Sequence, residues 1–378
     1  MLRENIFRQV VDMTISRRDF LKLVGGTAGL LALRPFSRVL PLPDFPKGER
    51  LGRLIDGKWE LKIAPNDQDA TIKDVYGDTI VMWLREVVGR RDTNHLNQRY
   101  VETPEGYIYA SYVQPVKNLP NIPLQALPAG QAGFWAEVTV PYVDFVLENA
   151  LASSPWLKNA QQWSLPTRLY YSQVMWIDQI KTSEVTGNII YRINERFGSY
   201  GDIFWADGAA FRPITQDEIS PITPEFDPNK KHVIANLTYQ TLSCMEGDNE
   251  VYYCRISSGA KWDAQGNIVD NWSTPVGNGH LTWRKSISIH MAGGTVGGGY
   301  DTPGVSWCTF FSGSGVAIHS TFWHNDYGVP RSHGCINVRP DDAKWIFRWS
   351  NPAVGLEPGD ITVGMPGGTQ VDVEERKY

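Results

Sequence analysis

Short apolar runs alternate with polar turns along most of the chain after its first fifty residues. Residues 58–63 and 78–84 are examples, and each run has the length of one β-strand. Glycine, proline, asparagine and aspartate gather between the runs, and these residue types favour tight turns. The pattern therefore predicts a mainly β protein made of short strands.

Two segments, 106–116 and 204–214, follow the same order of residue types. Each begins with an aromatic strand, passes through small residues and leaves through a hydrophobic-x-Pro-hydrophobic sequence, so that Pro115 aligns with Pro213. Both segments resemble parts of bacterial SH3-like modules, which are small β-barrels often found beside cell-wall enzymes. The resemblance implies one or two such barrels, although two unrelated β-meanders would give the same pattern.

Helical patterns are rare in this sequence. Residues 340–349 begin with proline, carry acids in the first turn and repeat apolar residues at helical spacing, which predicts a helix. Residues 141–151 have a weaker spacing of this kind and predict a short helix or irregular linking structure. Residues 35–50 contain four prolines and no clear period, which is typical of a linker.

The N-terminal region has the pattern of an export signal. The sequence Ser-Arg-Arg-Asp-Phe-Leu-Lys at 16–22 precedes an uncharged run at 23–33, which is too short for a typical membrane-spanning helix. The motif resembles the twin-arginine signal, an address read by a receptor. It implies export to the cell envelope or beyond, with cleavage and retention as an anchor both open and no further membrane span expected.

Composition narrows the function classes. The net charge of -5 gives no indication of nucleic-acid binding. Four cysteines are too few for a disulfide scaffold. Cys244 and Cys254 flank a Gly-Asp-Asn turn, so either a cross-strand disulfide or two buried thiols would fit an exported protein. Cys308 is expected to be a buried thiol.

The residues with catalytic potential lie just before the predicted helix at 340–349. His319 is followed sixteen positions later by Cys335, which ends the sequence Ser-His-Gly-Cys. A cysteine attacks as the thiolate, and its ordinary pKa of about 8.5 leaves little thiolate at neutral pH. A neighbouring histidine can accept the proton, and backbone N–H groups in a glycine-containing loop can stabilise an oxyanion. His319 and His333 are both candidate bases.

The sequences His-Ser-Thr at 319–321, Ser-His-Gly-Cys-Ile-Asn at 332–337 and Thr-Pro-Val-Gly at 274–277 resemble the signature of the L,D-transpeptidase catalytic domain family. The resemblance extends over residues 231–366 and implies a β-sandwich catalytic domain. Ser320 stands where glycine is commoner in the family. Gly279 stands where an aromatic residue often follows the Thr-Pro-x-Gly element, so the sequence does not define the substrate-facing wall.

The resemblance also implies roles for individual residues. Cys335 matches the nucleophile and His319 the general base, which favours His319 over His333. Ser320 matches the position whose carbonyl orients the histidine, and His333 and Gly334 match the loop that shapes the oxyanion site.

Three further residues are candidates for substrate contact. Asn337 matches a family position that holds the loop or contacts substrate. Tyr300 and Trp307 follow a glycine-rich segment that we expect to flank the cleft, although packed aromatics beside a surface loop would fit equally.

The family implies peptidoglycan stem peptides as partners, no metal or other cofactor, and formation of 3→3 cross-links through a thioester. Carboxypeptidase action and attachment of proteins to the wall use the same chemistry. A wall-binding protein with an inert catalytic domain is the non-enzymatic alternative. A zinc peptidase could use the same histidines, but the chain lacks a His-Glu-x-x-His motif.

The predicted organisation is a signal region (1–34), a linker (35–50), a first SH3-like module (51–118), a linking region (119–164), a second SH3-like module (165–216), the catalytic domain (231–366) and a C-terminal tail (367–378).

Overall fold

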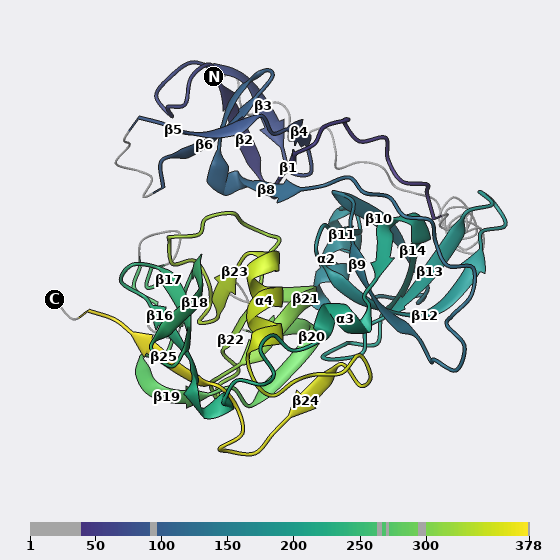
Figure 1. The fold of residues 1–378 in the computed structure, drawn as a ribbon. Coiled ribbons are helices and arrows are strands. Elements are labelled where there is room, and N and C mark those ends of the chain that lie inside the picture. Colours follow the sequence, from purple (N-terminus) through teal and green to yellow (C-terminus); the bar gives the residue numbers. More distant parts are fainter. Residues whose placement is uncertain (1–38, 91–96, 263–266, 270–271, 294–299, 377–378) are drawn as a thin grey trace, which may run out of the picture. The chain divides into compact units, whose positions relative to one another are not determined.

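The computed structural model describes residues 39–376 except 91–96, 263–266, 270–271 and 294–299. The predicted export signal at 1–34 lies outside these residues. The described chain is mainly β, as the sequence predicts, with its strands arranged in five sheets (Figure 1). Among these residues no helix is both long and apolar enough to cross a membrane.

Residues 51–116 form two small sheets around one core. The three-stranded sheet has the order β4-β1-β8 and the five-stranded sheet the order β3-β2-β7-β6-β5. Leu54, Leu61, Val101 and Ile108 are buried between them. The strands are β1 (Leu51–Leu54), β2 (Lys58–Lys62), β3 (Thr71–Tyr76), β4 (Ile80–Met82), β5 (Arg85–Val88), β6 (Arg99–Thr103), β7 (Gly106–Tyr109) and β8 (Val113–Val116).

A seven-stranded sheet follows, with the order β11-β10-β14-β13-β12-β9-β15. Its core includes Phe145, Tyr191, Phe204 and Phe211. The elements are β9 (Phe134–Val138), β10 (Tyr142–Leu147), α2 (Pro155–Trp163), β11 (Arg168–Tyr170), β12 (Val174–Thr182), β13 (Ile189–Asn194), β14 (Ile203–Asp207), β15 (Phe211–Pro213) and the short α3 (Gln216–Ile219).

The segment predicted as a short helix or irregular link is a strand. Within β10, Val143 and Phe145 are buried while Asp144 between them is partly exposed, which is the two-residue period of a strand. Strands β9 and β10 therefore belong to the seven-stranded sheet, and the region at 119–164 is only partly a link.

The repeated segments share a local structure. In the first, β7 leads through a 3₁₀ turn, η1 (Ala110–Tyr112), into β8, and in the second β14 leads through η2 (Gly208–Ala210) into β15. The small residues of the repeat form these turns. The assignment of either region to the SH3-like class stays a prediction.

Residues 231–374 form two five-stranded sheets, with orders β18-β17-β16-β25-β19 and β23-β22-β21-β20-β24. The predicted helix is present as α4 (Pro340–Trp349), which contacts β21 and β22. The strands are β16 (Lys231–Asn236), β17 (Thr241–Glu246), β18 (Asn249–Arg255), β19 (Gly277–Leu281), β20 (Arg284–Gly293), β21 (Tyr300–Phe310), β22 (Ala317–Ser320), β23 (Ile336–Val338), β24 (Asp360–Thr362) and β25 (Gln370–Glu374).

The chain after residue 366 is not simply a tail. Strand β25 pairs in parallel with β16 and antiparallel with β19, so it joins two neighbours within the first sheet. Val371 and Val373 point into the core, which supplies the physical reason for the pairing.

The cysteines are all free thiols. In the hairpin of β17 and β18, Cys244 pairs with Tyr252 and Cys254 with Leu242, so the two cysteines are not opposite each other. The structure has no disulfide between them. Cys308 is a buried thiol, as predicted.

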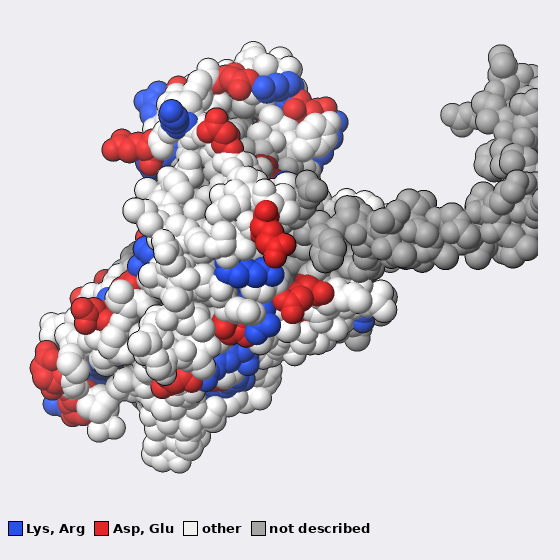
Figure 2. Space-filling view, turned by 90° about the vertical axis from the view of Figure 1, so that its right-hand side faces the viewer, with Lys and Arg blue, Asp and Glu red and all other residues white. Residues whose placement is uncertain are grey.

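Charged side chains on the face drawn in Figure 2 are interspersed. Lysine and arginine lie among aspartate and glutamate, and neither sign forms an extended area on that face.

Candidate active site

Two short parallel strands bring the candidate nucleophile and base together. Strand β22 pairs with β23 so that His319 lies beside Asn337. Because strand side chains alternate between faces, His319 and Asn337 share one face, and Cys335, two residues before Asn337, extends the same row. The pairing thus places groups sixteen positions apart in the sequence on one surface.

His319 is held in a defined orientation. Its Nδ1 lies 2.8 Å from the carbonyl oxygen of Ser320 and donates a hydrogen bond to it. A neutral imidazole with its proton on Nδ1 has a basic Nε2. The Ser320 carbonyl occupies the place that the family resemblance implied.

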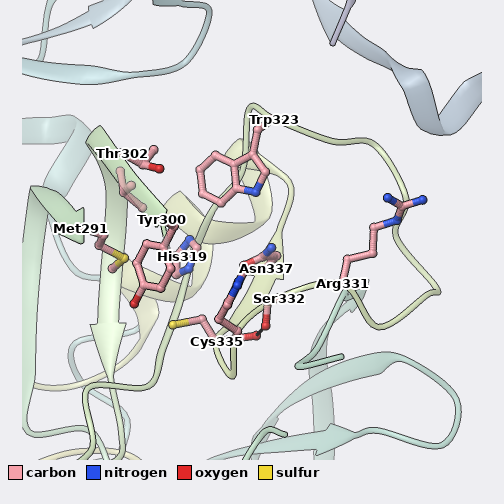
Figure 3. A pocket seen from close by; sticks show the side chains of 11 residues that line it. Met291, Tyr300, Thr302, His319, Trp323, Arg331, Ser332, Cys335 and Asn337 are labelled. Atoms are coloured by element: carbon pink, nitrogen blue, oxygen red, sulfur yellow. Dashed lines mark hydrogen bonds between the residues drawn. The ribbon is translucent and has the colours of Figure 1, made fainter. Parts of the chain in front are cut away.

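A cavity of about 280 Å³ opens over these residues. The imidazole of His319 and the sulfur of Cys335 point toward the same hollow, whereas Arg331 points away from it (Figure 3). The cavity is lined by Met291, Tyr300, Thr302, Val305, His319, Trp323, Arg331, Ser332, His333, Cys335 and Asn337.

Burial shifts the pKa values of Cys335 and His319 in the directions that disfavour a thiolate–imidazolium ion pair. It raises the pKa of the Cys335 thiol to about 11, although a hydrogen bond from the Ala317 backbone opposes this change. It lowers the pKa of His319 to about 4, against the opposing bond to Ser320. These shifts favour a thiol beside a neutral imidazole at neutral pH.

The loop before Cys335 is tied by two hydroxyl groups. Ser332 Oγ accepts the N–H of Gly334 at 3.1 Å and donates to the Cys335 carbonyl. Thr274 Oγ1 donates to the Gly334 carbonyl at 2.8 Å and accepts the N–H of Gly259 at 2.8 Å. Gly334 has φ 121°, a backbone conformation that favours glycine.

His333 is exposed at the edge of this loop. Its ring lies 4.1 Å from that of Trp272 and 5.3 Å from that of Tyr300, measured between centroids. Both histidines line the cavity, but His319 lies on the face that β22 and β23 share.

Asn337 is paired with a buried histidine. Its Nδ2 lies 3.0 Å from Nε2 of His324, while Oδ1 is buried without a partner among the described residues. Nδ1 of His324 already accepts the N–H of Asp326 at 3.2 Å, so a neutral His324 carries its proton on Nε2 and donates there. A flip of the Asn337 carboxamide satisfies both groups and leaves its Nδ2 as a donor beside the cavity.

Trp307 does not line the cavity, so it is not a residue for substrate contact as the sequence had suggested. It is 1% exposed and packs on Phe347 of α4, with ring centroids 5.5 Å apart. Simple alternation would place Trp307 on the same face as Val305, which lines the cavity. A left-handed φ of 59° at Trp307 breaks the alternation and turns its side chain into the core. Tyr300 does line the cavity.

Sequence reasoning missed Trp323, which forms a wall of the cavity. Its ring centroid lies 5.9 Å from that of His319. An aromatic residue four positions after the candidate base was the available signal. Met291, Thr302, Val305 and Arg331 were also not predicted to line the cavity.

Residues 51–116 hold the segment that carries Trp323. Arg53 Nη2 donates to the Phe322 carbonyl at 2.9 Å, and Asn325 Nδ2 donates to the Ala110 carbonyl at 3.1 Å. Ser111 Oγ donates to Asp326 Oδ1 at 2.7 Å. The segment between base and nucleophile is thus fixed on both sides of Trp323 by the N-terminal sheets.

His290 lies in a buried network next to the cavity. Its Nδ1 is 2.7 Å from Glu195 Oε2, and its Nε2 contacts Asp301. Burial alone would lower the pKa of His290, but the two carboxylates outweigh it and raise the pKa above the ordinary value. Among the described residues, no group of three or more His, Cys, Asp and Glu side chains has a metal-binding arrangement.

Residues 230–373 match the model of the L,D-transpeptidase catalytic domain family. The curated protein L,D-transpeptidase 2 of Mycobacterium tuberculosis is 35% identical over 108 residues, which cover 26% of this chain. The alignment spans 25% of the relative's length.

Solved structures with similarity include an Enterococcus faecium L,D-transpeptidase, with 23% identity, a TM-score of 0.29 and coverage of 39% of this chain and 50% of the other. Another is an L,D-transpeptidase from Mycobacterium smegmatis, with 16% identity, a TM-score of 0.30 and coverage of 49% and 90%.

Proposed function

Starting from the match of residues 230–373 to the L,D-transpeptidase catalytic domain, we propose that this chain forms 3→3 cross-links in peptidoglycan through a thioester on Cys335. The observation that carries the proposal is the shared cavity face of Cys335, His319 and Asn337, with the base oriented by the Ser320 carbonyl.

In the first step, Cys335 attacks the carbonyl carbon of the third residue of a stem tetrapeptide. The thiol proton passes to Nε2 of His319 as the C–S bond forms. The C–N bond to the terminal D-alanine then breaks, and the proton moves from His319 to the departing amine. The raised thiol pKa and lowered imidazole pKa favour transfer of the proton during attack over a resting ion pair.

In the second step, an amine of another stem attacks the thioester. Its nitrogen forms the new amide bond, the C–S bond breaks, and the proton released by the amine returns the sulfur to the thiol. Water in place of the amine gives carboxypeptidase action, and an amine on a protein gives attachment to the wall.

The rest of the chain has a supporting role in this proposal. The twin-arginine pattern would carry the enzyme out of the cytoplasm, and the β modules before the catalytic region would keep it near the wall. The scheme uses no metal. The reacting groups are the thiol of Cys335 and the imidazole of His319, and Asn337 lies on the same face.

The test is incubation of the purified chain with stem tetrapeptide, followed by intact mass and product analysis. We expect a thioester adduct on Cys335 and release of D-alanine. Cys335→Ala should abolish both, and His319→Ala should slow acylation by roughly 10²- to 10⁴-fold, the usual contribution of a general base. Normal turnover by Cys335→Ala would overturn the proposal, and an absent adduct with intact wall binding would favour the inert wall-binding alternative.

A further inference from the structure

A second cavity, of about 600 Å³, adjoins the catalytic cavity. Thr302 and Trp323 line both, so the two spaces share a wall. The volume lies within the ~300–1,000 Å³ typical of sites for small ligands. It is formed by residues from all three regions of the described chain, including Asp56 and Trp156 from outside the catalytic region.

Aromatic rings form much of its surface. Trp156, Tyr170, Phe322 and Trp323 contribute to the lining, and Tyr170 stacks on Phe322 with ring centroids 5.7 Å apart. Flat apolar faces of this kind bury the aliphatic parts of a ligand and leave its polar ends to hydrogen-bond. Leu165 also lines the cavity and is 52% exposed.

The charges of this cavity select against an anion. Among the described residues, Arg168 is the one guanidinium of the lining, and it is paired with two carboxylates, Asp78 at 2.8 Å and Asp144 at 2.6 Å. Asp56, by contrast, contributes an exposed carboxylate to the lining. A cationic amine is therefore favoured at the entrance over a carboxylate or phosphate.

The wall shared with the catalytic cavity is firmly built. Gln173 Nε2 donates to the Pro303 carbonyl at 2.6 Å, and the N–H of Trp156 donates to Asp301 at 2.7 Å. These bonds hold the start of β21, which carries Thr302, against the preceding region. The cavity is a formed feature and needs no closure to exist.

We propose that this cavity, the acceptor groove, binds the amine-bearing stem peptide that resolves the thioester. The inference rests on the proposed function, which requires a second peptide to reach Cys335 while the first occupies the catalytic cavity. The groove delivers the amine past Thr302 and Trp323. Its ammonium form gives up one proton to solvent water on the way, and the neutral nitrogen then attacks the thioester carbon. The C–N bond forms, the C–S bond breaks, and the proton released by the nitrogen passes to the sulfur through His319.

The test separates acylation from resolution of the thioester in the full chain. Leu165→Arg fills the groove and opposes a cation, and Asp56→Asn removes the exposed carboxylate. The matched controls are Leu151→Arg, at a residue 76% exposed outside the lining, and Asp248→Asn in the turn between β17 and β18. The readouts are D-alanine release in a single turnover and the ratio of cross-linked dimer to hydrolysed tripeptide.

We expect Leu165→Arg to lower the dimer-to-tripeptide ratio roughly tenfold, which corresponds to about 1.4 kcal/mol, and Asp56→Asn to lower it less. D-alanine release in both variants should stay within about twofold of the wild type, since 0.4 kcal/mol is roughly that factor. An unchanged ratio with intact acylation overturns the acceptor groove alone. A wild type that forms no thioester overturns the proposed function and the groove with it.

Discussion

At the scale of single residues, the loop before the nucleophile depends on the hydroxyl of Thr274, which lies 60 positions before its partner Gly334. Thr274 joins the carbonyl of Gly334 to the N–H of Gly259, and its side chain is buried. A buried polar group that loses its partner costs about 1–3 kcal/mol. Two backbone groups depend on this one hydroxyl.

Thr274→Val should therefore lower the free energy of unfolding by about 1–3 kcal/mol and slow acylation of Cys335, because the loop before the thiol loses its tie. Thr274→Ser keeps the hydroxyl and should retain most of the acylation rate. Chemical denaturation and single-turnover D-alanine release measure the two effects. Equal acylation rates in the Val and Ser variants would contradict this role.

His324 makes the fold sensitive to acid. Burial, with the positive charge of Arg331 as a second cause, lowers its pKa to about 3. The unfolded chain binds a proton at this histidine near its ordinary pKa of about 6.5, and the folded chain does not. Stability contributed by this residue is thus full above pH 6.5 and falls as the pH drops toward 3.

At pH 5 the loss relative to pH 8 should be about 2 kcal/mol, from a difference of roughly 1.5 pKa units. His324→Gln should remove this part of the pH dependence, which urea denaturation at the two pH values would measure. His232→Gln, at a half-exposed residue of β16, is the control. The same dependence in wild type and His324→Gln would rule out His324 as its source.

At this scale the candidate catalytic pair could be predicted from the sequence, because thiol and imidazole chemistry needs particular residue types at a fixed spacing. Trp307 could not be placed, because its left-handed φ reverses the ordinary alternation of β21. Trp323 was missed because its position depends on Arg53, which is 269 residues away from the contacted Phe322.

At the scale of elements, Arg53 of β1 connects the N-terminal sheets with the segment between base and nucleophile. It is 2% exposed and bonds Gln114, Asp78 and the Phe322 carbonyl at 2.8–2.9 Å. Its guanidinium also lies 3.9 Å from the ring centroid of Tyr170. One side chain thus contacts three separate parts of the chain.

Arg53→Met should lower the free energy of unfolding by roughly 3–5 kcal/mol, since it leaves buried partners without their charge. Acylation should slow as well, because Trp323 follows the released carbonyl. Arg85→Met is the control, because Arg85 is 70% exposed and its ion pair with Glu102 is screened by solvent, so that losing it should change stability little. Matching stabilities and rates in the two variants would contradict the connecting role.

Element prediction succeeded where the local pattern matched the packing. Helix α4 was predictable because Pro340, the acids of its first turn and its apolar spacing all agree. Strand β10 was not, since its six residues are too few to separate a two-residue period from a helical one. Strand β25 was missed because its partners β16 and β19 are distant in the sequence.

At the scale of the whole molecule, the described residues from Val39 onward form one compact unit. The sequence indicated separate modules, and the structure adds the bonds among them, such as Asn325 with Ala110 and Gln173 with Pro303. Long-range contacts of this kind depend on surface complementarity, which no local pattern records. Both the catalytic wall at Trp323 and the acceptor groove arise from them.

The position of β25 has a consequence for how the protein is made. Strand β16 begins at Lys231, yet its parallel neighbour β25 is formed by Gln370–Glu374. A ribosome adds roughly 5–20 residues per second, so β16 waits several seconds or more for that partner. Until residues 370–374 emerge from the ribosome, one edge of β16 has unpaired N–H and C=O groups that invite pairing with other chains. A chaperone that shields nascent β16 would therefore be most valuable late in translation.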